Sequence, residues 1–200
     1  MQGTRLSLRE DAAMVDIIGI VGMPGSGKSV ALETLQEHFN AKIINMGNMV
    51  REQVTLAGLE LNPTTLGEMA QQLREDRGPD VVAQLTAEKI DAVADDVDLV
   101  VIDGLRSMQE VQFFRNKWHF PVLAVHSPPE VRHSRMKERS REDDSSEEGY
   151  FKMRDERELG FGIAKVIALA NAMVVNGAQT TIKDLQVEII SEVKRITKIK

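Results

Sequence analysis

The chain has 200 residues and a mass of 22.3 kDa, with 42% apolar and 28% charged residues, which is typical of one compact globular domain and excludes a disordered chain, a collagen-like fibre and a coiled coil. The absence of cysteine excludes disulfides, thiolate metal sites and a cysteine nucleophile, and predicts the cytoplasm as the compartment. No apolar run reaches the roughly 18 residues of a membrane span, and a net charge of -6 argues against a general nucleic-acid-binding surface.

The first half of the chain predicts a strand, a helix, a second strand and two more helices. Residues 1–13 are polar and mixed in charge, and we expect a flexible arm there. The apolar run 16–21 ends near glycines and predicts a buried strand, followed by a helix that the spacing of Leu32, Leu35 and Phe39 indicates. A second short strand is expected at 42–45. Two helices are then expected between residues 63 and 97, each beginning with a proline at its first position, after Asn62 and after Gly78.

The second half alternates in the same way. Apolar runs predict strands at 98–103, 121–126 and 172–175, and apolar residues spaced by three and four predict an amphipathic helix at 182–196. Between them, 15 of the 22 residues at 137–158 are charged, so this stretch is expected to be too polar for the core. Short apolar strands that alternate with helices predict an α/β fold in which helices cover both faces of a five-stranded parallel sheet.

The clearest motif lies between the first strand and the first helix. It follows the phosphate-loop pattern of a glycine, four residues and then Gly-Lys-Ser. Glycines let backbone N–H groups curve around a polyphosphate, and the helix adds the positive end of its dipole. Lys28 is expected to contact the β- and γ-phosphates, and the Ser29 hydroxyl to ligate Mg²⁺. The loop residues are Gly22, Met23, Pro24, Gly25, Ser26, Gly27, Lys28 and Ser29.

Three polar side chains follow other predicted strands. Asp103 ends the third strand, where a carboxylate beside the phosphate loop can hold Mg²⁺; the alternative is an aspartate that caps local N–H groups. Arg51 and Arg106 come shortly after the second and third strands, near the edge where open α/β sheets bind ligands. Arginine forks match phosphate geometry, so both are candidates for holding an acceptor phosphate, with ordinary surface arginines as the alternative.

The charged stretch 137–158 has two interpretations. Charge runs are usually solvated surface, and many of these charges have opposite neighbours. The alternative is a lid whose arginines close over a phosphoryl group in transfer. The arginines in and just before the stretch are Arg132, Arg135, Arg139, Arg141, Arg154 and Arg157.

These motifs, in this order, resemble the nucleoside monophosphate kinases, adenylate kinase above all. The segment ending in Arg51 is similar to the acceptor-phosphate segment of that family, Asp103-Gly-Leu-Arg106 to its Asp-Gly-Phe-Pro-Arg, and Arg141-Glu-Asp-Asp to its lid motif. The resemblance implies an acceptor lobe at about 47–96 and a lid at about 137–158. It differs at Asn48, where those kinases have Asp, and at Glu110, where adenylate kinase has a glutamine that reads the base.

A second resemblance extends over nearly the full length. The phrases Gly-Met-Pro-Gly-Ser-Gly-Lys-Ser, Val-Ile-Asp-Gly-Leu-Arg-Ser and Arg-Asp-Glu-Arg-Glu-Leu-Gly-Phe-Gly-Ile are similar to a family of small archaeal proteins labelled adenylate-kinase-related or dephospho-CoA-kinase-related. Members of that family usually begin just before the first strand, which makes residues 14–200 the expected kinase-like domain.

Together, motif and resemblance imply a Mg·ATP-dependent kinase that acts on a nucleotide-like small metabolite, with no membrane partner. Lys28 would follow the γ-phosphoryl group, Ser29 and Asp103 would place Mg²⁺, and Arg139 and Arg141, with Arg157 as a third, would neutralise the developing charge. A dephospho-CoA-type acceptor is one alternative. Another is a nucleotide-dependent switch or assembly factor with slow ATPase activity, because the same loop serves both classes. The sequence leaves the acceptor and the oligomeric state open.

Overall fold

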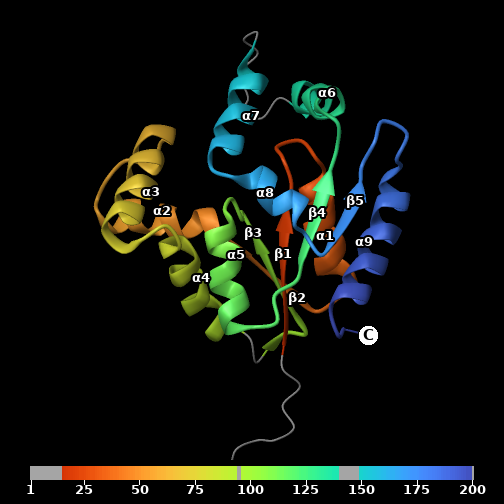
Figure 1. Ribbon diagram of the computed structural model, residues 1–200, viewed down its shortest axis with the longest axis horizontal. Coiled ribbons are helices and arrows are strands. Elements are labelled where there is room, and N and C mark those ends of the chain that lie inside the picture. The colour runs from red at the N-terminus through yellow and green to blue at the C-terminus, as the bar shows by residue number, and fades with distance from the viewer. Residues whose placement is uncertain (1–14, 94–95, 140–148, 200) are drawn as a thin grey trace, which may run out of the picture.

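The computed structural model describes residues 15–93, 96–139 and 149–199, and its centre is the parallel five-stranded sheet that the sequence predicts (Figure 1). The strand order is β2-β3-β1-β4-β5, and every neighbouring pair is parallel. All carboxyl ends therefore lie along one edge of the sheet. The strands are β1 (Asp16–Val21), β2 (Ala41–Asn45), β3 (Leu99–Asp103), β4 (Val122–His126) and β5 (Ala172–Val175).

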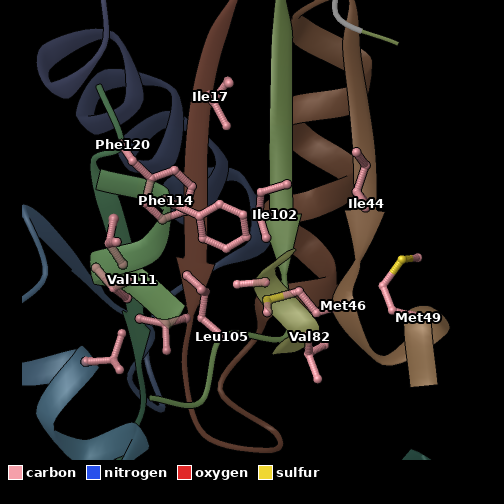
Figure 2. Packing of buried hydrophobic residues seen from close by; sticks show 14 of the residues in the cluster. Ile17, Ile44, Met46, Met49, Val82, Ile102, Leu105, Val111, Phe114 and Phe120 are labelled. Atoms are coloured by element: carbon pink, nitrogen blue, oxygen red, sulfur yellow. The ribbon is translucent and has the colours of Figure 1, made fainter. Parts of the chain in front are cut away.

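Side chains alternate between the two faces of the sheet along each strand, and this divides the core into two layers. In β1, Ile17 packs on one face of the sheet, while Ile18 and Ile20 pack on the other. Successive strand residues point to opposite faces, and both faces are covered, so the strands read as continuous apolar runs. Figure 2 shows the first layer, in which the rings of Phe114 and Phe120 lie against the sheet with their centroids 4.7 Å apart.

Helices cover the sheet on both faces, as expected from the alternating pattern. α1 (Lys28–His38) and α9 (Ile182–Ile196) lie together on one face. The buried side chains of α9 are Leu185, Ile189 and Val193, whereas Ile182 is exposed. The other face carries α4 (Val81–Asp91), α5 (Met108–Lys117) and α8 (Ile163–Ala168). Within the described part of the chain, no helix is long and apolar enough to cross a membrane.

The helices of the expected acceptor lobe project beside the carboxyl ends of the strands (Figure 1). They are α2 (Met46–Leu56) and α3 (Pro63–Arg77), which pack on α4. Asn62 caps α3 and Pro63 is its first residue, as predicted. The expected start of α4 at Pro79 is wrong by two residues. Gly78 has a positive φ of 99°, and a turn from its carbonyl to the N–H of Val81 delays the helix.

The charged stretch is less exposed than its composition suggests. It contributes the end of α6 (Pro129–Arg139) and most of α7 (Tyr150–Gly160), whose residues Phe151, Asp155 and Glu158 are buried. The prediction that the stretch is too polar for the core therefore fails at these three positions. For the two carboxylates the reason is pairing, because a buried charge is tolerated when an opposite charge and hydrogen bonds meet it.

The main pair that joins α7 to α6 is formed by Arg132 and Asp155. Two guanidinium nitrogens of Arg132 donate to the two carboxylate oxygens of Asp155 at 2.8 and 2.6 Å. His133 lies 3.1 Å from Asp155 and stacks on Phe151, so these contacts give it a structural role. Burial by itself raises the pKa of Asp155, but the hydrogen bonds and charges of Arg132 and His133 outweigh it and hold the pKa below its usual 3.8.

This pair gives a pH-dependent prediction. Asp155→Asn leaves the Arg132 charge buried and unpaired, and should lower the free energy of unfolding at neutral pH by about 3–5 kcal/mol. Because folding lowers the pKa of Asp155, its contribution is present above the unfolded-state pKa and is lost as the pH falls through the lower folded-state pKa. Urea unfolding of both proteins should therefore converge in acid. Glu156→Gln, on an exposed position of the same helix, is the control. A difference that stays constant with pH would contradict the assignment.

Candidate functional site

The phosphate loop connects the end of β1 to the start of α1, at the sheet edge where all strands end. Gly25 and Gly27 have positive φ values of 77° and 104°, a conformation that L side chains rarely adopt. A Cβ on Gly27 would also collide with the side-chain nitrogen of Asn176, and one on Gly25 would lie 2.8 Å from the carbonyl oxygen of Arg132. The loop thus requires glycine at these positions for both reasons.

Two side chains from distant elements hold the loop from outside. Arg132 donates to the carbonyl oxygen of Pro24 at 3.0 Å, and Asn176 donates to that of Ser26 at 2.9 Å. Asn176 is itself fixed by Arg135, which donates to its side-chain oxygen at 3.0 Å. Arg132 and Asn176 are almost completely buried. The carbonyl oxygens of Pro24 and Ser26 are therefore engaged from outside the loop by buried side chains.

Lys28 is folded over the loop that precedes it. Its ammonium group donates to the carbonyl oxygen of Gly22 at 2.6 Å, with Met23 at 3.4 Å. Burial lowers the pKa of Lys28, and the carboxylates of Asp103 and Glu158 partly counteract that effect. A buried ammonium group held by neutral carbonyl oxygens is well placed to exchange them for phosphate oxygens.

Asp103 lies at the carboxyl end of β3, where Asn45 orients it. The amide nitrogen of Asn45 donates to Oδ2 of Asp103 at 2.8 Å, while the amide oxygen accepts from the N–H of Gly47 at 2.8 Å and caps α2. Oδ1 of Asp103 is buried and has no hydrogen-bond partner among the described residues. A buried oxygen atom usually has a partner, and a bound cation or a water ligand of that cation would supply one for Oδ1.

These residues fit a magnesium ion that is held jointly by protein and nucleotide. Ser29 is exposed to the cavity described below, and Asp103 lines the same cavity. Within the described residues, no group of three His, Cys, Asp or Glu side chains forms a complete metal site. Magnesium usually keeps several waters and binds through one or two protein groups plus substrate phosphates, so an all-protein cage is not required.

One cavity of about 650 Å³ is lined by the loop and by residues of α2 and α3. Its size suits small-molecule ligands. The structure brings most of the predicted site residues to this cavity, including Arg51 and Arg106. The Arg51 guanidinium donates to Asn48 at 3.2 Å, and Arg106 pairs with Glu158 at 3.4 Å. The predicted residues that line the cavity are Gly22, Pro24, Gly25, Gly27, Lys28, Ser29, Arg51, Asp103 and Arg106.

The predicted charge-neutralising arginines are placed less centrally. Arg157 has a side chain that is 61% exposed, and it is not among the residues that line the cavity. Arg139 is the last residue of α6, and Arg141 lies outside the described residues. Arg154, one turn before Arg157 on α7, does line the cavity.

Sequence reasoning left several charged or polar side chains out of the site. Asn45 is the last residue of β2 and Asn176 directly follows β5, so the rule that singled out Asp103 at the end of β3 applies to them as well. Arg74 and Glu110 lie within helices and carry no such signal. Glu110 accepts the N–H groups of Arg106 and Ser107, at 2.8 and 3.1 Å, in the capping box of α5. The missed residues that line the cavity are Asn45, Arg74, Glu110 and Glu158, and Arg135 and Arg154, which the sequence named only among the arginines of the charged stretch, line it as well.

Comparison with known proteins assigns the chain to a family. A family model described as an AAA domain matches residues 21–149. A UPF0200 protein of Methanocaldococcus jannaschii is 43% identical over 160 residues, which cover 80% of this chain and 81% of that protein. A UPF0200 protein of Hyperthermus butylicus is 39% identical over 181 residues, covering 90% and 95%. The chain belongs to the AAA domain family and to the UPF0200 proteins. The suspected archaeal family is thereby confirmed.

Solved structures confirm the fold. TT1252 from Thermus thermophilus aligns with a TM-score of 0.60 at 19% identity, covering 91% of this chain and 98% of that one. Shikimate kinase from Acinetobacter baumannii, solved in complex with shikimate, aligns with a TM-score of 0.55 at 14% identity, covering 90% and 94%. At these identities the likeness concerns the fold, which is that of P-loop kinases.

The Asn45 bridge gives a second prediction. Asn45→Asp keeps an oxygen for the Gly47 N–H but replaces the donor to Asp103 with a second carboxylate. The lost hydrogen bond and the repulsion should lower the free energy of unfolding by about 1–3 kcal/mol at neutral pH. The loss should shrink as the pH falls and one of the two carboxylates takes up a proton that it can donate to the other.

Chemical unfolding at several pH values measures this effect. Asn48→Asp is the matched control, because Asn48 is exposed in the first turn of the same helix and should change stability by less than about 0.5 kcal/mol. Equal effects of the two substitutions would show that the Asn45–Asp103 bond does not stabilise this site.

Proposed function

We propose that this protein is a Mg·ATP-dependent phosphotransferase that moves the γ-phosphoryl group of ATP to a nucleotide-like small metabolite. The observation that carries the proposal is that one cavity is lined both by the phosphate loop and by the strand-end arginines Arg51 and Arg106. A kinase needs donor and acceptor phosphates within one enclosed space, whereas a switch needs only the nucleotide site.

The charge of the cavity supports an anionic ligand pair. Six cationic side chains and three carboxylates line it, an excess of three positive charges in a chain whose net charge is -6. Cationic side chains focused in a cleft raise the local concentration of anionic substrates even when the whole protein is acidic. The cations are Lys28, Arg51, Arg74, Arg106, Arg135 and Arg154, and the carboxylates are Asp103, Glu110 and Glu158.

The places of Lys28, Ser29 and Asp103 around the cavity support their proposed roles. Lys28 would contact the transferred phosphoryl group, and Ser29 and Asp103 would hold Mg²⁺. The ion, when bound, bridges phosphate oxygens and neutralises their charge. Arg139, Arg141 and Arg157, in the proposed lid at 137–158, would approach the phosphoryl group when the lid closes. The relatives' UPF0200 names specify no acceptor, while one structural neighbour is a shikimate kinase in complex with shikimate.

The third prediction tests donor binding. Lys28→Ala removes a charge-assisted contact to phosphate and should weaken Mg·ATP binding by about 1.5–3 kcal/mol, roughly 10- to 150-fold in Kd. Isothermal titration calorimetry measures this change. Lys42→Ala, at an exposed position on β2, is the control and should leave the affinity unchanged. Equal affinity of the Lys28 variant and the wild type would remove the basis of the proposed function.

The fourth prediction concerns the acceptor side. A thermal-shift screen with Mg·ADP and a panel of nucleotides, dephospho-CoA and shikimate should reveal an acceptor through the added stabilisation that a bound ligand gives. Arg51→Ala and Arg106→Ala should each reduce that added shift while the shift with Mg·ADP alone stays near wild type, since both residues lie on the acceptor side. Arg77→Ala, in the last turn of α3 and exposed, is the control. Normal acceptor shifts in both variants would reject the assignment of an acceptor phosphate to these arginines.

A further inference from the structure

The cavity contains one carboxylate whose role the proposed function leaves open, that of Glu158. It lies on α7, is 7% exposed, and lines the cavity together with Lys28 and Arg106. Its Oε2 is 3.4 Å from Nε of Arg106, the candidate acceptor-phosphate residue, and Oε1 is 3.7 Å from the exposed Arg157. A nearly buried carboxylate is thus held at the boundary between the two proposed substrate sites.

The charges that act on Lys28 place Glu158 on the donor side of the cavity as well. Burial lowers the pKa of Lys28, Asp103 and Glu158 raise it, and Arg106 and Arg154 lower it. Coulomb interactions of this kind weaken with distance, and Glu158 lines the same cavity as Lys28. Glu158 therefore acts electrostatically on the group that would hold the γ-phosphate and forms an ion pair with a group that would hold the acceptor.

The other two carboxylates that line the cavity, Asp103 and Glu110, are already held by hydrogen-bond donors. One oxygen of Asp103 is fixed by Asn45, and the other is buried beside the phosphate loop. Glu110 accepts two backbone N–H groups at the start of α5 and is 3.8 Å from Arg74. Glu158 instead pairs with side chains that a substrate can engage. Among the described residues of the cavity, it is the carboxylate best placed to accept a proton.

Whether the reaction needs a carboxylate at the position of Glu158 depends on the chemical group that accepts the phosphoryl group. A phosphate acceptor is already an anion and has no proton that must be removed, so a carboxylate base would have no proton to accept from it. A hydroxyl acceptor is a weak nucleophile and must lose its proton during transfer, and kinases use a carboxylate to take it. The position of Glu158 therefore favours a hydroxyl group as the attacking atom.

We infer that Glu158 is a catalytic base and that the acceptor is an alcohol that also carries an anionic group. This inference rests on the proposed function. In the reaction, the acceptor oxygen forms a bond to the γ-phosphorus while the bond from that phosphorus to the β,γ-bridging oxygen breaks. ADP leaves with the electron pair, and the hydroxyl proton passes to Glu158 and then to solvent. The anionic group of the acceptor is held by Arg51 and Arg106.

The first experiment identifies the bond that is made. Wild-type protein with Mg·ATP is incubated separately with nucleoside monophosphates, nucleosides, dephospho-CoA and shikimate, and the products are followed by ³¹P NMR. A phosphate monoester gives a signal without phosphorus–phosphorus coupling, whereas a phosphoanhydride gives coupled signals. The expected product of the best acceptor is a monoester. Preferential formation of a nucleoside diphosphate from its monophosphate would overturn the inference while leaving the proposed phosphotransferase function intact.

The second experiment tests the residue. Glu158→Gln keeps a hydrogen-bond acceptor for Arg106 but is no longer a base, and should lower kcat by roughly 10²- to 10⁴-fold. Mg·ATP affinity should be equal or tighter, because a negative charge leaves the site. Glu156→Gln, exposed and two residues away on the same helix, should keep wild-type kcat. A Glu158→Gln protein with wild-type kcat would overturn the inference.

If no metabolite in the panel is phosphorylated, water serves as the smallest hydroxyl acceptor. Single-turnover hydrolysis of ATP should then be slowed in Glu158→Gln and unchanged in Glu156→Gln. Equal hydrolysis by wild type and Glu158→Gln would overturn the role of Glu158. A wild-type protein that transfers phosphoryl groups neither to a metabolite nor to water would overturn the proposed function, a result that differs from either failure of the inference.

Discussion

The burial of Arg132 is the constraint on which the rest of the site depends. This guanidinium holds the Pro24 carbonyl oxygen of the phosphate loop, and at 3% exposure it needs a matching negative charge. Asp155 supplies that charge from α7, so the brace of the loop fixes the helix as well. Because Glu158 lies three residues after Asp155 on the same helix, it comes to lie in the cavity. The structural ion pair between Arg132 and Asp155 thereby positions Glu158, the residue that we propose as the catalytic base.

The donor and acceptor sides are linked through a second, smaller contact. Asn45 uses one end of its amide to cap α2 of the acceptor lobe and the other to orient Asp103. If α2 moved when an acceptor binds, Asn45 would transmit the movement to Asp103, the carboxylate proposed to hold magnesium. The N-terminal end of α5 is fixed in a similar way, because the Glu110 carboxylate caps it and keeps Arg106 beside the cavity. Local capping interactions thus set the positions of the groups on the acceptor side.

Features with a local cause were predictable from the sequence, and features that need a distant partner were not. The glycine loop, the strands and the capping of α3 at Asn62 each follow from a few adjacent residues. The burial of Asp155 does not, since its partner Arg132 is 23 positions away and both lie in or beside a run of charges that reads as surface. For the same reason Glu158 was indistinguishable from its exposed neighbour Glu156. The strand-end rule pointed to Asp103, which lines the cavity, and would have found Asn45 and Asn176 had it been applied to amides.

The charges around Lys28 bear on the order in which ATP and the acceptor would bind. Its ammonium group is unfavourable in a buried site, and without nucleotide the carboxylates of Asp103 and Glu158 offset part of that cost. The phosphates of ATP would bring more negative charge than either carboxylate and would take over that task. Asp103 would then be available to magnesium, and Glu158 would no longer be needed to balance Lys28. The proposed base therefore becomes available to a hydroxyl proton after the donor has bound, which favours binding of ATP before the acceptor.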